Sequence, residues 1–333
     1  MTAVVPFPRG RKAITAADPR LARSYMLTFV GDWGGASMHK VCCWLTEEFC
    51  RRAGPKSRTA IWSMADDDQV TLVQNGVADL CLMTPAMLGP SHVAGTGFYA
   101  GQAAPNLRAL AAIPQNDCLI LAVAPEFGIS SYADLRAKRP ALRIATPPKT
   151  NPIGYVARLL LEAHGIDEAQ LAAWGVTFVE DEHPFDAADR VLNGQADALM
   201  HEAVMTPGWV RIVESGKGVP LPAEPAALAQ LRQRFGLPSN QLPAGFWNTL
   251  TAPLDALDFS DFLILVRDDM PDEVAHLLTW CAVEARSELE RQYMSIPSNR
   301  SPVTYPFDPK KMGQTAVPLH PGAQRYYQEA GYL

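Results

Sequence analysis

A short motif occurs twice in this chain and limits how it can fold. Residues 75–83 read NGVADLCLM and residues 193–200 read NGQADALM. In both copies an Asn-Gly pair, which is typical of a helix end, leads directly into a short apolar strand. A strand, a loop and a helix precede each copy. The recurrence predicts two related lobes, each with alternating strands and helices around a mostly parallel sheet.

The first of these units lies in residues 27–50. An apolar run ends at Val30, a glycine loop follows, and apolar residues then recur at helical spacing from Val41 to Phe49. A glycine loop before a helix presents backbone N–H groups and the positive end of the helix dipole, which suits a small anion such as a carboxylate. A turn that merely packs is an equally compatible interpretation. The loop reads GDWGGAS and does not match the dinucleotide fingerprint GxGxxG.

The same alternation continues along the chain. We expect further strands at residues 58–64, 78–83, 107–114, 118–124, 142–146, 176–179, 196–200 and 262–267. We expect helices at residues 69–75, 154–164, 186–192 and 269–288.

Composition narrows the function classes. The chain has 333 residues, which is the length of two lobes, and 29 Lys and Arg against 35 Asp and Glu give a net charge of −6. No basic block is dense enough for a nucleic-acid partner, and no apolar run reaches the length of a membrane span. No metal-ligand spacing, phosphate-binding loop or GxSxG motif is present, so we expect neither a metal nor a cofactor.

The N-terminal extension, residues 1–22, bears on the compartment. It contains Pro6, Pro8, Arg9 and Arg11 without an apolar segment followed by a small-residue cleavage site. Six cysteines fall inside apolar patterns, as buried reduced thiols do. We therefore expect the protein in the cytoplasm as the sequence stands. A native start further upstream would instead allow export to the periplasm.

The end of the chain carries a resemblance. Residues 318–333, PLHPGAQRYYQEAGYL, resemble the closing signature of TAXI-type solute-binding proteins of TRAP transporters, an NMT1-like group. NGVADL, LRALAAI, the link SSYADLRAKR at 130–139 and LPAGFW are similar to that family in layout, so the resemblance covers residues 27–333.

The resemblance implies an α/β, two-lobe, periplasmic-binding-protein-like fold of type II. In such a fold the ligand lies in the cleft between the lobes, and two crossover strands, expected here at 118–124 and 262–267, join them. Lobe one would comprise residues 23–119 and 267–333, and lobe two residues 120–266. Several loops depart from the family's usual sequence, so its usual amino-acid-like or dicarboxylate solutes are not carried over.

Candidate ligand-binding residues follow from the position of the loops. In open α/β sheets ligands bind beyond the carboxyl ends of the strands, and aromatic side chains there can stack on a planar solute. The candidates are Asp32, Trp33, Gly34, Gly35, Ser37, Trp62, Ser63, Thr84, Lys149, Thr150, Asn151, His201, Glu202, Phe246 and Trp247. Trp62 could instead be a core residue, and Lys149 could instead lie on a solvated loop.

Two hypotheses about function result. The first is a TAXI-like receptor that binds a small carboxylate-bearing solute with an aromatic or apolar body, with TRAP membrane subunits as partners if the protein is exported. The alternative is a cytoplasmic enzyme on the same fold, such as a decarboxylase or other lyase acting on an aromatic carboxylic acid. Its candidate catalytic residues are His201, Glu202 and His183.

Overall fold

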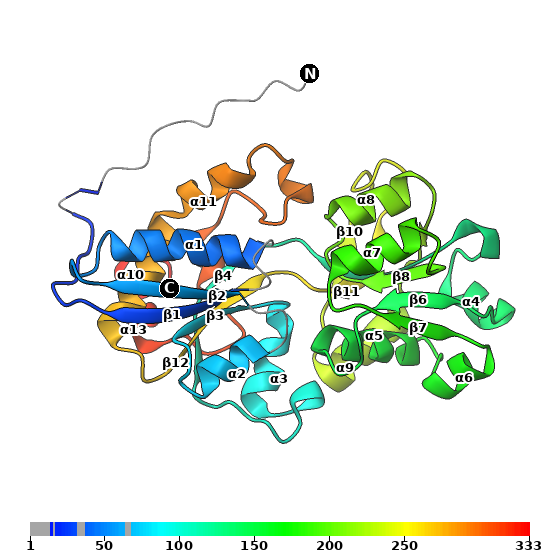
Figure 1. Cartoon of the computed structure of the whole chain (residues 1–333), viewed down its shortest axis with the longest axis horizontal. Helices are drawn as coiled ribbons and strands as arrows, with labels where there is room; N and C mark the ends of the chain where they lie inside the picture. Colours follow the sequence, from blue (N-terminus) through cyan, green and yellow to red (C-terminus); the bar gives the residue numbers. More distant parts are fainter. Residues whose placement is uncertain (1–13, 16, 32–36, 64–67) are drawn as a thin grey trace.

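Two sheets organise the molecule. The structure is a computed structural model that describes residues 14–15, 17–31, 37–63 and 68–333. Each sheet has helices on both of its faces, and the two lobes lie side by side along the long axis (Figure 1). The expected two-lobe α/β class is confirmed.

Lobe one is built on a five-stranded sheet within the described residues. Its strand order is β2-β1-β3-β12-β4, with β1 parallel to β2 and β3, and β12 antiparallel to β3 and β4. The strands are β1 (Met26–Gly31), β2 (Arg58–Ser63), β3 (Leu80–Met83), β4 (Leu107–Ile113) and β12 (Phe262–Arg267).

Helices cover both faces of this sheet. The longer ones are α1 (Ser37–Cys50), α2 (Asp68–Gln74), α10 (Asp272–Glu284), α11 (Arg286–Tyr293) and α13 (Pro321–Glu329). Shorter turns are η1 (Ala86–Leu88), α3 (Gly89–Ala94), η2 (Gly97–Tyr99), η4 (Ser298–Arg300) and α12 (Pro309–Met312). The single helix expected at 269–288 is interrupted at Ala285, where α10 ends and α11 begins.

Lobe two has a seven-stranded sheet in the part of the chain that the structure describes. Its order is β10-β11-β5-β8-β6-β7, and β9 pairs with β5. The strands are β5 (Cys118–Val123), β6 (Arg143–Thr146), β7 (Thr177–Glu180), β8 (Ala198–His201), β9 (Val219–Pro220), β10 (Ser239–Leu242) and β11 (Leu254–Asp258). The helices are η3 (Pro125–Phe127), α4 (Tyr132–Lys138), α5 (Pro152–Ala163), α6 (Glu168–Ala173), α7 (Pro184–Leu192), α8 (Pro207–Glu214) and α9 (Pro225–Phe235).

Both sheets mix parallel and antiparallel pairs, so the expectation of mostly parallel sheets is wrong. The parallel pairs are those within each repeated unit, β1 with β2 and β3, and β6 with β7 and β8. The antiparallel pairs involve β12 in lobe one, and β5, β9, β10 and β11 in lobe two. Strands β5 and β12 are the ones that enter their lobes from the linkers.

Successive side chains of β12 point to opposite faces of the sheet in lobe one. Ile264 and Val266 pack with α1, α10 and α13, whereas Leu263 and Leu265 pack with the α2 side. The cluster on the α2 side continues into lobe two, where it includes Leu121 and the α5 residue Leu160. One apolar core therefore extends through both lobes.

The repeated motif makes the same hydrogen bonds in both lobes. Asp79 accepts from the Thr28 N–H at 2.7 Å and donates its own N–H to Thr28 O at 2.8 Å. Asp197 accepts from the Arg143 N–H at 2.8 Å and donates its N–H to Arg143 O at 2.8 Å. Each aspartate thus fixes the start of its strand against the first strand of its unit.

The glycine of each motif copy has the backbone conformation that the turn requires. Gly76 has φ of 72° and Gly194 has φ of 71°, in the left-handed region that favours glycine. Two copies with the same turn and the same aspartate contacts agree with the expectation that the lobes are related.

Two short linkers join the lobes, at residues 114–117 and 259–261. They are hydrogen-bonded to each other: Asp261 N–H donates to Gln115 O at 3.1 Å, and Gln115 N–H donates to Asp261 Oδ1 at 3.0 Å. Phe259 N–H also donates to Asp117 O at 3.0 Å. The expected crossover strands are wrong in this respect, because β5 lies wholly in the sheet of lobe two and β12 wholly in that of lobe one. The lobe boundaries accordingly fall in the linkers rather than at 119 and 266.

We expect Asp79→Ala and Asp197→Ala each to lower the free energy of unfolding by about 1–3 kcal/mol, because a strand N–H then loses its acceptor. Chemical denaturation measures this. Asp189→Ala, which removes an exposed partner of Arg211, is the control and should change stability by less than about 1 kcal/mol. Equal losses in all three variants would contradict the structural role of the motif.

Candidate functional site

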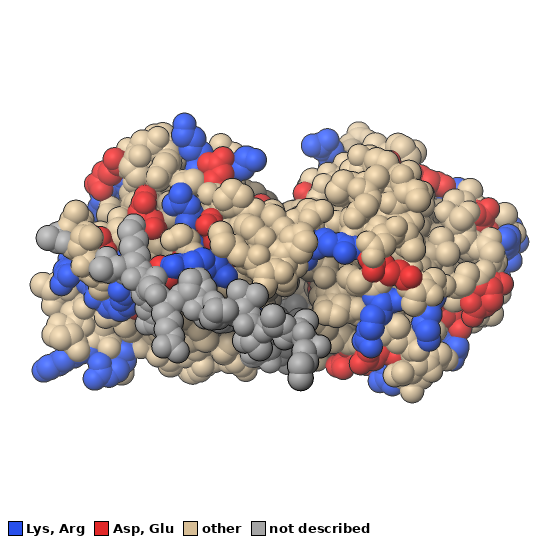
Figure 2. All heavy atoms as spheres, turned by 90° about the horizontal axis from the view of Figure 1, so that it is seen from above, with Lys and Arg blue, Asp and Glu red and all other residues tan. Residues whose placement is uncertain are grey.

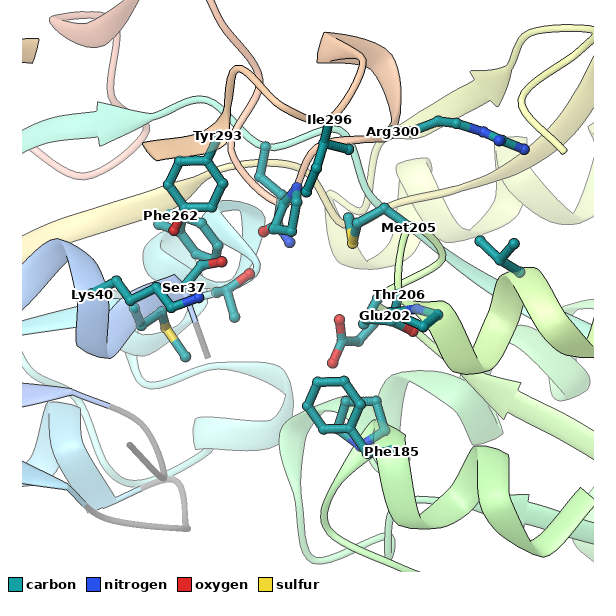
Figure 3. A pocket seen from close by; sticks show the side chains of 18 of the residues that line it. Ser37, Lys40, Phe185, Glu202, Met205, Thr206, Phe262, Tyr293, Ile296 and Arg300 are labelled. Carbon is teal, nitrogen blue, oxygen red and sulfur yellow. The ribbon is translucent and has the colours of Figure 1, made fainter. Parts of the chain in front are cut away.

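A cavity of about 520 Å³ lies between the lobes and next to the linkers. The space-filling view shows a notch between the two lobes, and the close-up shows side chains of both converging on the cavity (Figures 2 and 3). This volume is typical of sites for small molecules.

Lobe one supplies a wall with hydrogen-bond donors. Ser37, Met38 and Lys40 come from the first turn of α1, which begins next to the gap between the lobes and runs away from it (Figure 1). Thr84 follows the carboxyl end of β3, and Phe262 begins β12. The start of α1 adds the partial positive charge of the helix dipole to this wall.

A segment from near the C-terminus closes another side. Gln292, Tyr293, Ile296, Arg300 and Pro302 line the cavity, and they belong to α11, η4 and the turns around them. Tyr293, Ile296 and Phe262 form a largely apolar surface opposite lobe two (Figure 3).

Lobe two contributes the starts of two helices and the end of a strand. Pro184 and Phe185 open α7, Thr206 and Pro207 lead into α8, and Glu202 follows β8. Ala203, Met205 and Val210 complete this wall. The Glu202 carboxylate points toward the middle of the cavity, above the Phe185 ring (Figure 3).

A buried carboxyl pair connects this wall to the first linker. Asp117 Oδ1 accepts from the N–H groups of Cys118 at 2.7 Å and Val204 at 3.1 Å, and Oδ2 accepts from Ala203 N–H at 2.9 Å. Burial raises the pKa of Asp117 to about 6, although its hydrogen bonds with Glu202 and with these N–H groups act to lower it. Asp117 therefore ties the segment that carries Glu202 to the first linker.

His201 lies behind this wall. It is fully buried, and its Nδ1 accepts from the Glu202 N–H at 3.0 Å. Burial, assisted by the charge of His183, lowers the pKa of His201 to about 3. The imidazole is therefore neutral at ordinary pH and supports the strand end from behind the cavity.

Arg300 links the lobes at the cavity rim. Its side chain points away from the cavity toward lobe two, where it pairs with Glu214 of α8 at 2.6 Å and donates to Phe246 O (Figure 3). Glu214 also accepts from Asn248 N–H at 3.0 Å, and this bond and the Arg300 guanidinium hold the pKa of Glu214 below its usual range. The ion pair therefore joins the lobes at the cavity rim, in addition to the hydrogen bonds between the linkers.

Of the candidate residues named from sequence, Ser37, Thr84 and Glu202 line this cavity. Trp62 is exposed at the end of the edge strand β2, and Ser63 bonds to His39 Nδ1 at 3.0 Å instead. Asp32, Trp33, Gly34 and Gly35 lie outside the described residues.

The loop that follows β6 in lobe two borders a different pocket. Lys149 and Thr150 border a smaller pocket of about 400 Å³ beside α5 and α6, and Lys149 pairs with Glu168 at 3.2 Å. Asn151 caps α5, since its side chain accepts from Ile153 N–H at 2.8 Å. These three residues therefore have local roles, and the structure does not bring them to the cavity between the lobes.

Phe246 and Trp247 were expected in the cleft, and this is wrong. Both are fully buried in the core of lobe two, where Trp247 stacks on Trp209 with ring centroids 5.9 Å apart. Their rings cover the sheet face beneath α7 and α8. The sequence of a proline-rich loop does not show which way an aromatic ring in it points. Here both rings point into the core, where their apolar surface is removed from water.

Sequence reasoning missed several wall residues. Phe262, Tyr293, Ile296 and Arg300 reach the cavity because the chain returns to lobe one, and no local pattern signals this. Asp117 carried a usable signal, since it is a charged residue directly before the fully buried strand β5.

Two α/β lobes around an interlobe cavity define the class of bilobal solute-binding-protein folds. A solved periplasmic transporter protein matches with a TM-score of 0.52 at 11% identity, covering 93% of this chain and 95% of that one. A TctC solute-binding protein from Polaromonas matches with a TM-score of 0.51 at 11% identity over 93% and 99% of the two chains. A Xanthomonas citri protein bound to ATP matches with a TM-score of 0.50 at 15% identity over 93% and 97%.

The model of the NMT1-like family matches residues 50–331. The chain belongs to this family.

The structure describes no group of three or more His, Cys, Asp or Glu side chains suited to a metal ion among its placed residues. Within the same residues, no helix is both long and apolar enough to cross a membrane.

We expect Arg300→Gln to open the cleft of the ligand-free protein, because it removes the ion pair between the lobes. Small-angle scattering should show a larger radius of gyration, while the free energy of unfolding falls by about 1 kcal/mol or less. Arg211→Gln, which removes a pair between two helices of lobe two, is the matched control and should leave the radius unchanged. An equal change in both variants would argue against an interlobe role for Arg300.

Proposed function

We propose that the protein is a receptor that binds a small carboxylate with an apolar, aromatic body in the cavity between its lobes. The observation that carries this proposal is the composition of the cavity wall. Ser37 and Lys40 offer a hydroxyl donor and a positive charge at the start of α1, and a helix N-terminus favours an anion. Phe262, Tyr293 and Ile296 lie beside them and suit an apolar body.

The carboxylate of the solute is best accommodated at the lobe-one wall. Glu202 on the opposite wall carries an acid group that would repel a second negative charge (Figure 3). A solute held by α1 on one side and by the starts of α7 and α8 on the other would contact both lobes at once. Such a solute stabilises the closed arrangement because it binds that arrangement better than an open one.

No observation favours the lyase hypothesis. His201 is fully buried, and the cavity wall formed by the described residues includes Glu202 but neither His201 nor His183. The candidate catalytic residues named from sequence are therefore not assembled together at the cavity within the described residues.

The TAXI subtype, with TRAP membrane subunits as partners, is part of the proposal. It is supported by the C-terminal segment 318–333 and by the family to which the chain belongs. Such a partner is met outside the cytoplasm, so this part depends on export. Fractionation of the native host decides between the compartments: a longer precursor processed to a periplasmic form supports the TRAP partner, and a cytoplasmic pool of full-length chain contradicts it.

Binding itself is tested by a thermal-shift screen of aromatic and aliphatic carboxylates. A true ligand present at one hundred times its dissociation constant should add about 2.7 kcal/mol to the free energy of unfolding. Lys40→Gln should weaken binding of the best carboxylate about three- to tenfold, since one charge of the wall is lost.

Lys56→Gln, on an exposed loop of lobe one, is the control and should bind like the unmodified protein. The proposal fails if no carboxylate shifts the unfolding midpoint, or if both lysine variants lose affinity equally.

A further inference from the structure

We infer that Phe185 is the residue of lobe two that recognises the body of the solute, by contact of its ring with a planar aromatic ring. The inference rests on the proposed function and deepens it, because it names the side chain that distinguishes an aromatic body from a saturated one of the same size. The carboxylate of the solute remains at the start of α1.

The first observation is the position of Phe185 on α7. The buried residues Ala187, Ala188 and Val191 form one stripe of this helix, which packs into the core of lobe two. Phe185 lies outside this stripe and packs into none of the apolar clusters that the described residues form. It is 43% exposed and lines the cavity. Its ring therefore offers apolar surface whose burial by an occupant of the cavity is favourable.

The second observation is another exposed apolar residue on the facing wall. Ile296 lines the cavity from the segment between α11 and η4 and is 38% exposed. Seven large apolar side chains are exposed among the described residues, and Phe185 and Ile296 are the two of them that line this cavity. They lie on opposite sides of it (Figure 3). A flat ring between them would cover apolar surface of both lobes.

Contact between the lobes does not by itself cover the Phe185 ring. Arg300 already pairs with Glu214 of lobe two at 2.6 Å, and the linkers are hydrogen-bonded to each other. In this arrangement Phe185 remains exposed beside a cavity of about 520 Å³. The space next to the ring is therefore open to a solute and is not filled by lobe one.

The position of the ring suits the orientation of the proposed solute. Ser37 and Lys40 belong to the lobe-one wall, across the cavity from Phe185 (Figure 3). A carboxylate held at that wall directs the body of the solute toward α7. Met205 and Val210 add aliphatic surface to the lobe-two wall. Aliphatic surface does not favour an aromatic ring over a saturated one, whereas a phenyl ring does so through offset or edge-to-face contacts.

Two probes that differ only in the ring separate the inference from the proposed function. Para-ethylbenzoate and its saturated counterpart, trans-ethylcyclohexanecarboxylate with the ethyl group opposite the carboxylate, have the same carbon skeleton and the same charge. Burial of apolar surface alone favours the saturated compound, which has more hydrocarbon surface. We expect the unmodified protein to bind the benzoate about two- to tenfold more tightly in isothermal titration calorimetry, the effect of one aromatic pair.

Phe185→Leu keeps an apolar side chain and removes the ring. The preference for the benzoate should then fall to about onefold, while the affinity for the saturated compound changes by less than about threefold. Phe185→Tyr retains a ring and should keep the preference. Phe127→Leu, the same exchange on η3 of lobe two and outside the cavity wall, is the matched control and should also keep it.

The outcomes distinguish the inference from the proposed function. Equal affinities of the two compounds for the unmodified protein, or a preference that survives in Phe185→Leu, overturn the inference and leave the proposed function standing. An equal loss of both affinities in Phe185→Leu also overturns it, because the side chain then contributes apolar surface alone. If neither compound binds the unmodified protein, the inference and the proposed function both fail.

A nuclear magnetic resonance measurement on the unmodified protein applies if Phe185→Leu does not fold. We expect an intermolecular nuclear Overhauser effect between the ring protons of Phe185 and those of bound para-ethylbenzoate. Its absence while the benzoate is bound overturns the inference.

Discussion

The two hydrogen-bonded linkers limit how the lobes can move relative to each other. Gln115 and Asp261 exchange hydrogen bonds, and Asp117 accepts from Phe259, so the two chain crossings form one short antiparallel contact. Asp261 holds a left-handed conformation, with φ of 67°, in order to make this contact. Two crossings bonded side by side permit rotation of the lobes about their common line and resist sliding. The cavity lies next to this line, so a small rotation changes its width directly.

Polarity is divided between the two sides of the cavity. Lobe one presents the start of α1 with Ser37 and Lys40, whereas lobe two presents Glu202 and the first linker presents Gln115. On the proposed function, a solute that contacts both walls would couple its binding to closure of the lobes. The Arg300–Glu214 pair makes the same kind of contact from the protein itself, joining the lobes by opposite charges at the rim.

The sequence predicted features that depend on neighbouring residues. Asn75–Gly76 and Asn193–Gly194 mark helix ends through local conformation, and the aspartates that follow them bond to strands of the same unit. The class of fold and three cavity residues, Ser37, Thr84 and Glu202, followed from such patterns. The placement of β12, Phe246 and Tyr293 did not, because it depends on where the chain returns after long separations. Hydrophobicity predicts that a side chain is buried and does not predict against which lobe.

The apolar cluster that extends from Leu263 and Leu265 through Leu119 and Phe259 to Leu160 has a consequence for folding as a whole. Lobes that share side chains of one core lose part of its packing when either lobe unfolds, so their unfolding is coupled. The protein should behave as one cooperative unit in calorimetry, and a fragment holding lobe two alone would expose apolar surface at its truncated linkers. The hinge therefore lies inside the structural core, which allows the cleft to change width without turning the two halves into independent domains.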